Sequence, residues 1–144
     1  METAVLLSLL SHGSHLKVIV EGISFVRELL PQSHIVAETS PVINLESLKS
    51  QSDVLHALVE DLTENERAES SAAIHVCLSQ LADTMTQIQN NFEQIDKTIH
   101  EHNKKWFNYF RSYSVEEPKE RLAKLAPKLD EQMDRLIKIL AIPN

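Results

Sequence analysis

Residues 74–99, IHVCLSQLADTMTQIQNNFEQIDKTI, decide the fold because their apolar side chains recur at alternating steps of four and three. The stripe consists of Ile74, Leu78, Leu81, Met85, Ile88, Phe92, Ile95 and Ile99. This spacing predicts a long helix that buries one narrow face against other helices. The polar positions beside the stripe are largely uncharged, which favours a bundle over an isolated two-stranded coiled coil. One further step passes His102 and reaches Trp106.

The composition also favours an all-α chain. Only two glycines and five prolines occur among 144 residues, and 42% of the residues are hydrophobic. A single domain of this size buries a sizeable core without disulfides or metal. The single cysteine, Cys77, excludes an internal disulfide and fits a reducing compartment.

The N-terminal segment predicts two helices separated at Gly13. AVLLSLL (4–10) belongs to a short first helix, and a second helix runs from Ser14 to Leu30, where Pro31 stops it. The second helix has a wide apolar face, from Leu16 to Leu30, that includes Val20. AVLLSLL lacks the basic flank and the cleavage site of a signal peptide, and no apolar run approaches the length of a membrane span. We therefore expect a soluble, cytoplasmic protein.

The middle of the chain predicts a loop over 31–40 and a helix that starts at Ser40–Pro41 and continues to Leu62. Its inward residues are Leu45, Leu48, Leu55, Leu58, Val59 and Leu62, and Ser52 falls in the same stripe. Thr63–Glu66 matches a capping box that would open the long helix.

A second capping box, Ser114–Glu117, predicts the start of the last helix. Its inward stripe is Leu122, Leu125, Leu129, Met133, Leu136 and Leu140. Pro127 lies inside that helix and predicts a kink or a split. Together the segments predict one domain over residues 1–144: an antiparallel four-helix bundle with an extra short N-terminal helix.

Catalytic chemistry is missing from the sequence. His12/His15 span the predicted break, and His100/His102 are two residues apart, which points their rings away from each other on a helix. Cys77 has no basic neighbour in sequence to lower its pKa, so we interpret it as a packed thiol. We predict no catalytic, cofactor-binding or metal-binding residues, and no enzyme activity. A net charge of −7 argues against nucleic acid as a partner.

KKWFNYFRSY (104–113) holds five of the seven aromatic residues and three cations. One interpretation is that its aromatic residues close the end of the core. The other is that Trp and Tyr beside Lys and Arg form a contact surface for lipid or protein. The two are compatible, because Phe107 and Phe110 can pack inward while Lys104, Tyr109 and Arg111 face outward.

The order of these segments resembles a known family. The long helix LSQLADTMTQIQNNFEQIDKTIHEHNKK, the corner WFNYFRSY and the amphipathic PKERLAKLAPKLDEQMDRLIKIL are similar to the N-terminal four-helix bundle of mixed lineage kinase domain-like proteins. Fungal HeLo domains and the N-terminal bundle of Cbl adaptors are comparable. The resemblance covers about residues 3–140 and lies in helix order and length rather than in a motif.

The resemblance implies the N-terminal domain of a larger cell-death or innate-immune protein. Such domains self-associate on activation and permeabilise the plasma membrane, to which they are recruited. Animal members bind anionic lipid through basic early helices, whereas residues 1–103 here carry five cations and fifteen anions. Basic contacts would then come from residues 104–128, and the apolar N-terminus provides a second route. The candidate membrane or partner contacts are Leu6, Leu7, Leu10, Lys104, Lys105, Tyr109, Arg111, Lys119 and Lys124.

The strong inward stripes and the acidic surface also fit a second hypothesis. In it the chain is a non-enzymatic adaptor or oligomerisation module that binds a protein partner and has no activity on lipid.

Overall fold

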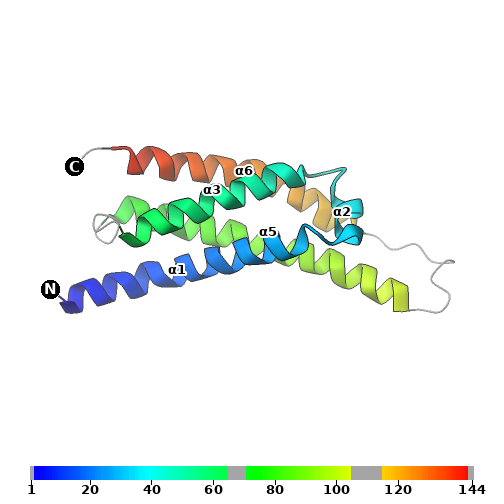
Figure 1. The fold of residues 1–144 in the computed structure, drawn as a ribbon, viewed down its shortest axis with the longest axis horizontal. Helices are drawn as coiled ribbons and strands as arrows, with labels where there is room; N and C mark the ends of the chain where they lie inside the picture. Colours follow the sequence, from blue (N-terminus) through cyan, green and yellow to red (C-terminus); the bar gives the residue numbers. More distant parts are fainter. Residues whose placement is uncertain (1, 65–70, 105–114, 143–144) are drawn as a thin grey trace.

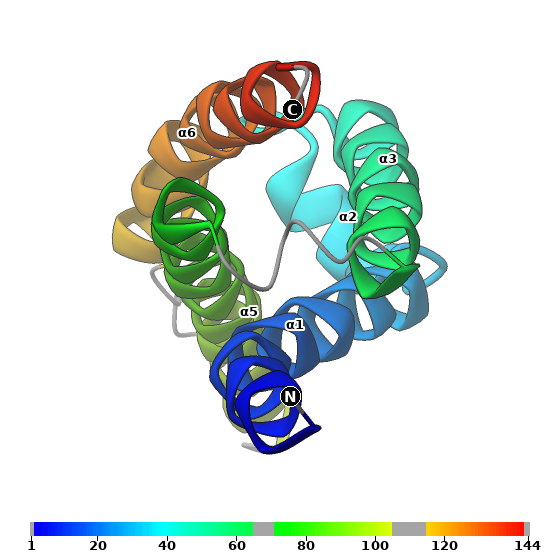
Figure 2. The same cartoon turned by 90° about the vertical axis from the view of Figure 1, so that its left-hand side faces the viewer.

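The computed structural model describes the backbone of residues 2–64, 71–104 and 115–142, and side chains from Ser14 onward within these ranges except those of Ser33, Asn103 and Lys104. All the regular structure in these ranges is helical. The helices are α1 (Glu2–Leu29), α2 (Ser33–Thr39), α3 (Leu45–Glu64), α5 (Ala72–Lys104) and α6 (Glu116–Leu140). Four long helices lie lengthwise, and the short α2 covers one end (Figures 1 and 2). The main contacts join α5 to α6 and to α1, and α1 to α3.

The predicted stripe of α5 forms the centre of the core. All eight of its residues, from Ile74 to Ile99, are at most 5% exposed. Because α5 packs against both α1 and α6, this stripe lies in the contacts with two of the other three long helices, and α3 packs mainly on α1. The prediction that residues 74–99 form a buried helical seam is confirmed.

The partner helices present the expected stripes with small differences at their edges. Leu48, Ser52, Leu55, Val59 and Leu62 of α3 are buried, as are the first five predicted residues of α6. Leu45, Leu58 and Leu140 are only partly buried. The wide face predicted for the first long helix is wrong at Val20, which is 39% exposed.

The break predicted at Gly13 is wrong, because α1 is one continuous helix from Glu2 to Leu29. A single glycine inside a helix costs only about 1 kcal/mol relative to alanine, so helical turns on both sides can carry the chain through it. The extra short helix of the fold is α2, which lies where a loop was predicted. Within α2, Ile35 and Thr39 are buried, and the Thr39 hydroxyl donates to the Ile35 carbonyl at 2.7 Å.

The start predicted at Ser40–Pro41 is also wrong. Residues 40–42 form a turn, residues 43 and 44 are not helical, and α3 begins at Leu45. Asn44 caps this helix, because its Oδ1 accepts a hydrogen bond from the Ser47 N–H at 3.0 Å. Both sites have a good capping residue, and the burial of Ile35 and Ile43 selects the later one.

The first predicted capping box does not cap the long helix, and the second lies partly outside the described residues. Thr63 lies inside α3, where its hydroxyl donates to the Glu60 carbonyl, and Glu66 lies outside the described residues. The α5 N–H of Ile74 is bonded instead by the Ser71 hydroxyl at 3.2 Å. The cap position of α6 is Val115, without a side-chain hydrogen bond, and Ser114 is not described.

Pro127 does not split α6, which continues from Glu116 to Leu140. The proline and Ala123, whose carbonyl loses its helical donor, are both exposed. Water can therefore bind that carbonyl, which lowers the cost of an internal proline.

Candidate functional site

The three predicted leucine contacts, Leu6, Leu7 and Leu10, lie in the first turns of α1. The ribbon of these turns lies at the margin of the bundle, on the side away from α6 (Figure 2). Further along the same helix, Ile19, Ile23 and Val26 are buried in the core. The apolar N-terminal turns are thus a continuous extension of a firmly packed helix.

The predicted aromatic and basic contacts can be placed only in part. Lys104 is the last residue of α5, and Lys105, Tyr109 and Arg111 lie in the segment outside the described ranges. The predicted packing of Phe107 and Phe110 lies there too.

Two cations of the C-terminal helix contact other parts of the protein. The Lys119 side chain is 13% exposed, and its Nζ lies 3.8 Å from Glu38 of α2 and 3.5 Å from Glu116. Arg121 donates to Asn91 Oδ1 at 2.7 Å and to Gln94 Oε1 at 3.2 Å, both on α5. Lys124 and Lys128 are exposed. Among the predicted cations that the structure describes, Lys119 and Arg121 contact α2 or α5, and Lys124 and Lys128 lie on the surface of α6.

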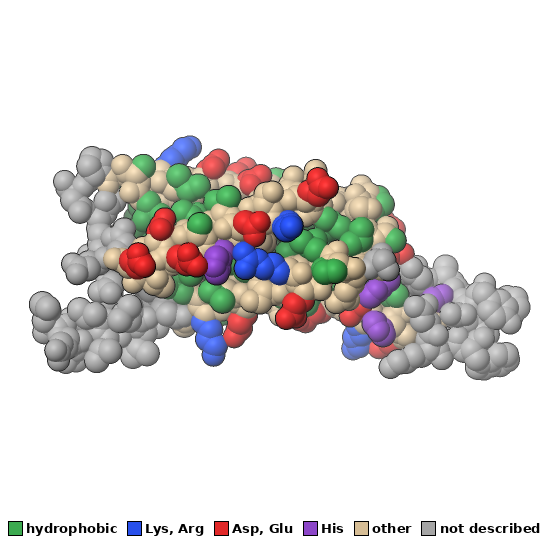
Figure 3. Space-filling model, in the orientation of Figure 1, with side chains coloured by type: hydrophobic (Ala, Val, Ile, Leu, Met, Phe, Trp, Pro, Cys, Tyr) green, Lys and Arg blue, Asp and Glu red, His purple; other side chains and the backbone are tan. Residues whose placement is uncertain are grey.

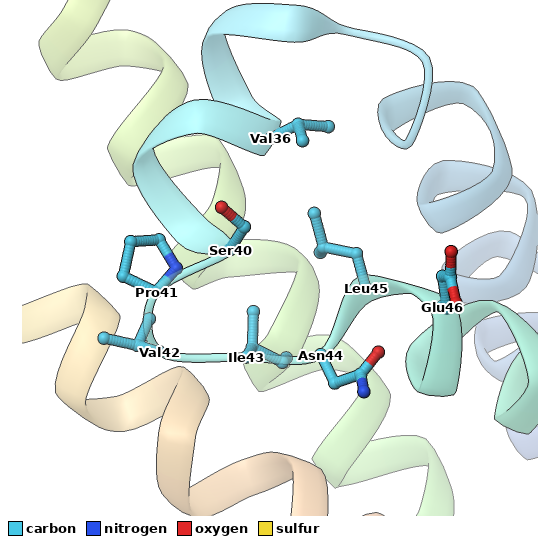
Figure 4. Close-up of a pocket in the computed structure, with 8 residues that line it drawn as sticks. All are labelled: Val36, Ser40, Pro41, Val42, Ile43, Asn44, Leu45 and Glu46. Carbon is cyan, nitrogen blue, oxygen red and sulfur yellow. The ribbon is translucent and has the colours of Figure 1, made fainter.

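A hollow lies where α2 meets α3, and its volume is about 530 Å³. It is lined by Val36, Ser40, Pro41, Val42, Ile43, Asn44, Leu45 and Glu46 (Figure 4). Val36 and Leu45 face its interior from the two helices, and both are only partly buried. Its mixture of aliphatic walls and a polar rim is suited to contact with an apolar side chain of a partner.

Three side chains with metal-binding atoms meet between α2 and α5. His34 Nε2 lies 2.7 Å from Asp96 Oδ1, and His100 Nδ1 lies 3.3 Å from the same oxygen. The two imidazole rings stand edge to face, with centroids 5.7 Å apart. Histidine side chains gather at this end of the molecule in Figure 3. We call these three residues the His34–Asp96–His100 cluster.

Sequence reasoning missed this cluster because it paired His100 with His102. Asp96 and His100 are four residues apart and therefore share a helix face, a signal that the sequence did contain. His34 is 62 residues from Asp96, and only the packing of α2 on α5 brings it there.

Three further titratable residues, His15, His75 and Cys77, pack against other helices. His15 and His75 pack ring against ring at 5.0 Å, which joins α1 to α5. Burial raises the pKa of the Cys77 thiol, and the charge of Arg135 on α6 opposes this shift without cancelling it. The thiol therefore stays protonated at neutral pH, although a basic residue does lie near it.

Comparisons with known proteins do not assign the chain to a family. No family model, curated protein or solved structure matches it. Within the described ranges, none of the helices is both long enough and apolar enough to span a membrane.

Proposed function

We propose that the chain is a non-enzymatic antiparallel four-helix bundle that self-associates on activation and disrupts a membrane through the N-terminal turns of α1. The plasma membrane of a cell undergoing regulated death or an immune response is the proposed target, and a cytoplasmic location precedes recruitment. The observation that carries the proposal is the position of AVLLSLL in a marginal helical extension of a packed helix.

The N-terminal extension of α1 has apolar residues on every face. At 100° per residue, Val5, Leu6, Leu7, Leu9 and Leu10 distribute apolar groups around the helix rather than along one stripe. A helix at the margin of a bundle has neighbours on one side only. Insertion into the interfacial region of a bilayer, or contact with a second copy, would bury the remaining faces.

Two interactions could bring the chain to a membrane, apolar insertion and electrostatic attraction, and electrostatic attraction has the weaker support. Lys119 and Arg121 are engaged within the bundle, and the N-terminal two thirds of the sequence is acidic. Lys124 and Lys128 remain available on the surface of α6. Apolar insertion is therefore the proposed main contribution, and charge assists it.

Dye release from liposomes, anionic and neutral in parallel, tests the proposal. We expect the purified chain to cause leakage, and we expect deletion of residues 2–11 or the double change Leu6→Glu/Leu10→Glu to abolish it. The control is Val54→Glu, which places a charge of the same sign at an apolar residue of α3 that is 46% exposed. Leakage that persists after the deletion would contradict the role of α1.

A salt series separates insertion from charge. If the basic residues contribute, Lys124→Ala/Lys128→Ala should reduce leakage from anionic vesicles at low salt and have little effect at high salt. Lys119→Ala should instead reduce stability by about 0.5–1 kcal/mol, because it removes the ion pairs that join α6 to α2. Chemical denaturation of both variants would distinguish a lipid contact from a structural one.

The hollow between α2 and α3 favours a second function, an adaptor module that binds a protein partner. We expect such a partner to be captured by the native chain and lost with Val42→Asp, while Val54→Asp retains it. A chain that captures no partner and still releases dye would exclude this alternative.

A further inference from the structure

The geometry points to a binding site for one divalent transition-metal ion of the zinc class at the His34–Asp96–His100 cluster. The ligand set of two imidazoles and one carboxylate would join α2 to α5. This inference is independent of the membrane activity proposed above.

The distances in the cluster are close to those of a zinc site. Zn²⁺ lies about 2.0–2.2 Å from nitrogen and oxygen ligands, so two ligands of a tetrahedral site are about 3.3 Å apart. His100 Nδ1 and Asp96 Oδ1 are already 3.3 Å apart. His34 Nε2 and Asp96 Oδ1 are 2.7 Å apart and would separate by about 0.6 Å when an ion replaces their shared proton. One ligand atom from each residue lies within 4.8 Å of the other two.

The helices hold the three residues in place. Asp96 and His100 project from the same face of α5, next to the buried Ile95 and Ile99. His34 is at the start of α2, whose position is fixed by the burial of Ile35 and Thr39. The cluster therefore requires rotamer changes rather than movement of a helix to accept an ion.

The site is open to solvent. The side chains of His34, Asp96 and His100 are 38%, 36% and 61% exposed. An ion can therefore enter without unfolding the bundle. Three protein ligands leave a fourth position for water, as in zinc sites that are not purely structural.

The chemistry of the ligands selects the class of metal. Mg²⁺ and Ca²⁺ prefer oxygen ligands, and here only one of the three groups is a carboxylate. Imidazole nitrogen binds Zn²⁺, Co²⁺, Ni²⁺ and Cu²⁺ well. His100 Nδ1 lies 3.1 Å from the Asp96 carbonyl oxygen, so in the metal-free protein this nitrogen carries the proton. Metal binding at Nδ1 would shift the ring to its other tautomer, in which Nε2 carries the proton.

Metal binding would stabilise the attachment of α2, because the ion binds the folded arrangement and not the unfolded chain. The apparent melting temperature should rise by about 5–10 °C when free zinc exceeds its dissociation constant about 100-fold. Magnesium at the same concentration should leave it unchanged.

The test is a titration of the full 144-residue chain with Zn²⁺ and, as a spectroscopic probe, Co²⁺. We expect one ion per chain, the intense visible absorption of four-coordinate cobalt, and its loss on addition of zinc. His34→Gln, Asp96→Asn and His100→Gln should each weaken binding at least tenfold and remove the thermal shift. Circular dichroism shows whether each variant is folded.

The matched control is His56→Gln. His56 Nε2 lies 2.9 Å from Glu60 at a spacing of four residues on α3, so it forms a histidine–carboxylate pair without a second imidazole. This variant should bind zinc as the native chain does. Binding that is unchanged in all three cluster variants would overturn the site, as would binding that is lost with His75→Gln, which alters the other pair of packed histidines. Absence of binding to the native chain would also overturn it.

Discussion

Thr84 of α5 donates a hydrogen bond of 2.7 Å from its hydroxyl to Gln132 Oε1 of α6, and both side chains are buried. This polar pair lies in the most extensive helix–helix contact of the protein. Among the described residues, no buried side-chain polar atom lacks a partner. The pair therefore fixes the register of α5 against α6, because a shift of either helix would leave two buried polar groups unpaired.

Replacing Thr84 with valine should lower the free energy of unfolding by about 1–3 kcal/mol, because the buried amide oxygen of Gln132 loses its donor. Thr86→Val, at an exposed position of the same helix, should change stability by less than about 0.5 kcal/mol. The double variant Thr84→Val/Gln132→Leu should recover most of the loss. Urea denaturation gives the free energy of unfolding of each variant. If the loss in the double variant equals the sum of the losses in Thr84→Val and Gln132→Leu, the two side chains do not interact.

Gly22 allows α1 and α5 to approach closely. A methyl group there would lie 2.9 Å from Met85 Cε and 3.1 Å from Met85 Cβ. We expect Gly22→Ala to lower stability by about 1–3 kcal/mol, although alanine is the better helix former. Ser24→Ala, on an exposed position of α1, should be neutral or slightly stabilising. A higher denaturation midpoint for Gly22→Ala would show that the helices can separate at little cost.

Asn44 determines where α3 begins. Asn44→Ala should cost about 1 kcal/mol, since the Ser47 N–H loses its side-chain acceptor. Ser40→Ala should cost less than about 0.5 kcal/mol, because Ser40 is exposed and contributes its backbone N–H, which alanine retains. Thermal unfolding followed by circular dichroism compares them. Equal losses would mean that the Ser40 side chain contributes a cap as strong as that of Asn44.

Cys77 should make the protein less stable in alkali. Burial raises the pKa of its thiol in the folded state, so the unfolded chain ionises first as the pH rises. The stability contributed by the neutral thiol is complete below the pKa of the unfolded state and is lost as the pH rises above about 9. Urea midpoints at pH 7.5 and pH 10 should therefore differ more for the native chain than for Cys77→Ala. Identical pH dependence would mean that the thiol does not carry the effect.

Much of the fold could be predicted from apolar residues that recur at helical spacing. The stripes of 74–99 and 122–136 were predictable because a helix face is determined by residue spacing alone, whichever helix covers it. Helix ends were less predictable. Ser40 and Asn44 are both suitable caps, and Thr63 begins a sequence that matches a capping box yet lies inside α3. Local energies at these positions differ by about 1 kcal/mol or less, so burial of neighbouring apolar residues decides between them.

Some features of the candidate sites were also predictable from residue spacing, and others depend on how the helices pack. Asp96 and His100 share a face through their spacing, and the uncharged residues beside the α5 stripe favoured a bundle over an isolated two-stranded coiled coil. Thr84 and Asn91 do meet α6 there. The roles of Lys119 and His34 depend on α2, whose helical conformation the sequence did not indicate.

By itself, therefore, the sequence determined that the protein is helical, which faces of its helices are buried, and that its N-terminal turns are apolar around the helix. Only the tertiary structure decided that α1 is continuous through Gly13, that α2 exists, and that His34 meets Asp96 and His100. The physical reason is the range of the interactions. Helical periodicity arises within a few residues, whereas a seven-residue helix is too short to be stable alone and forms only where the other helices bury Ile35 and Thr39.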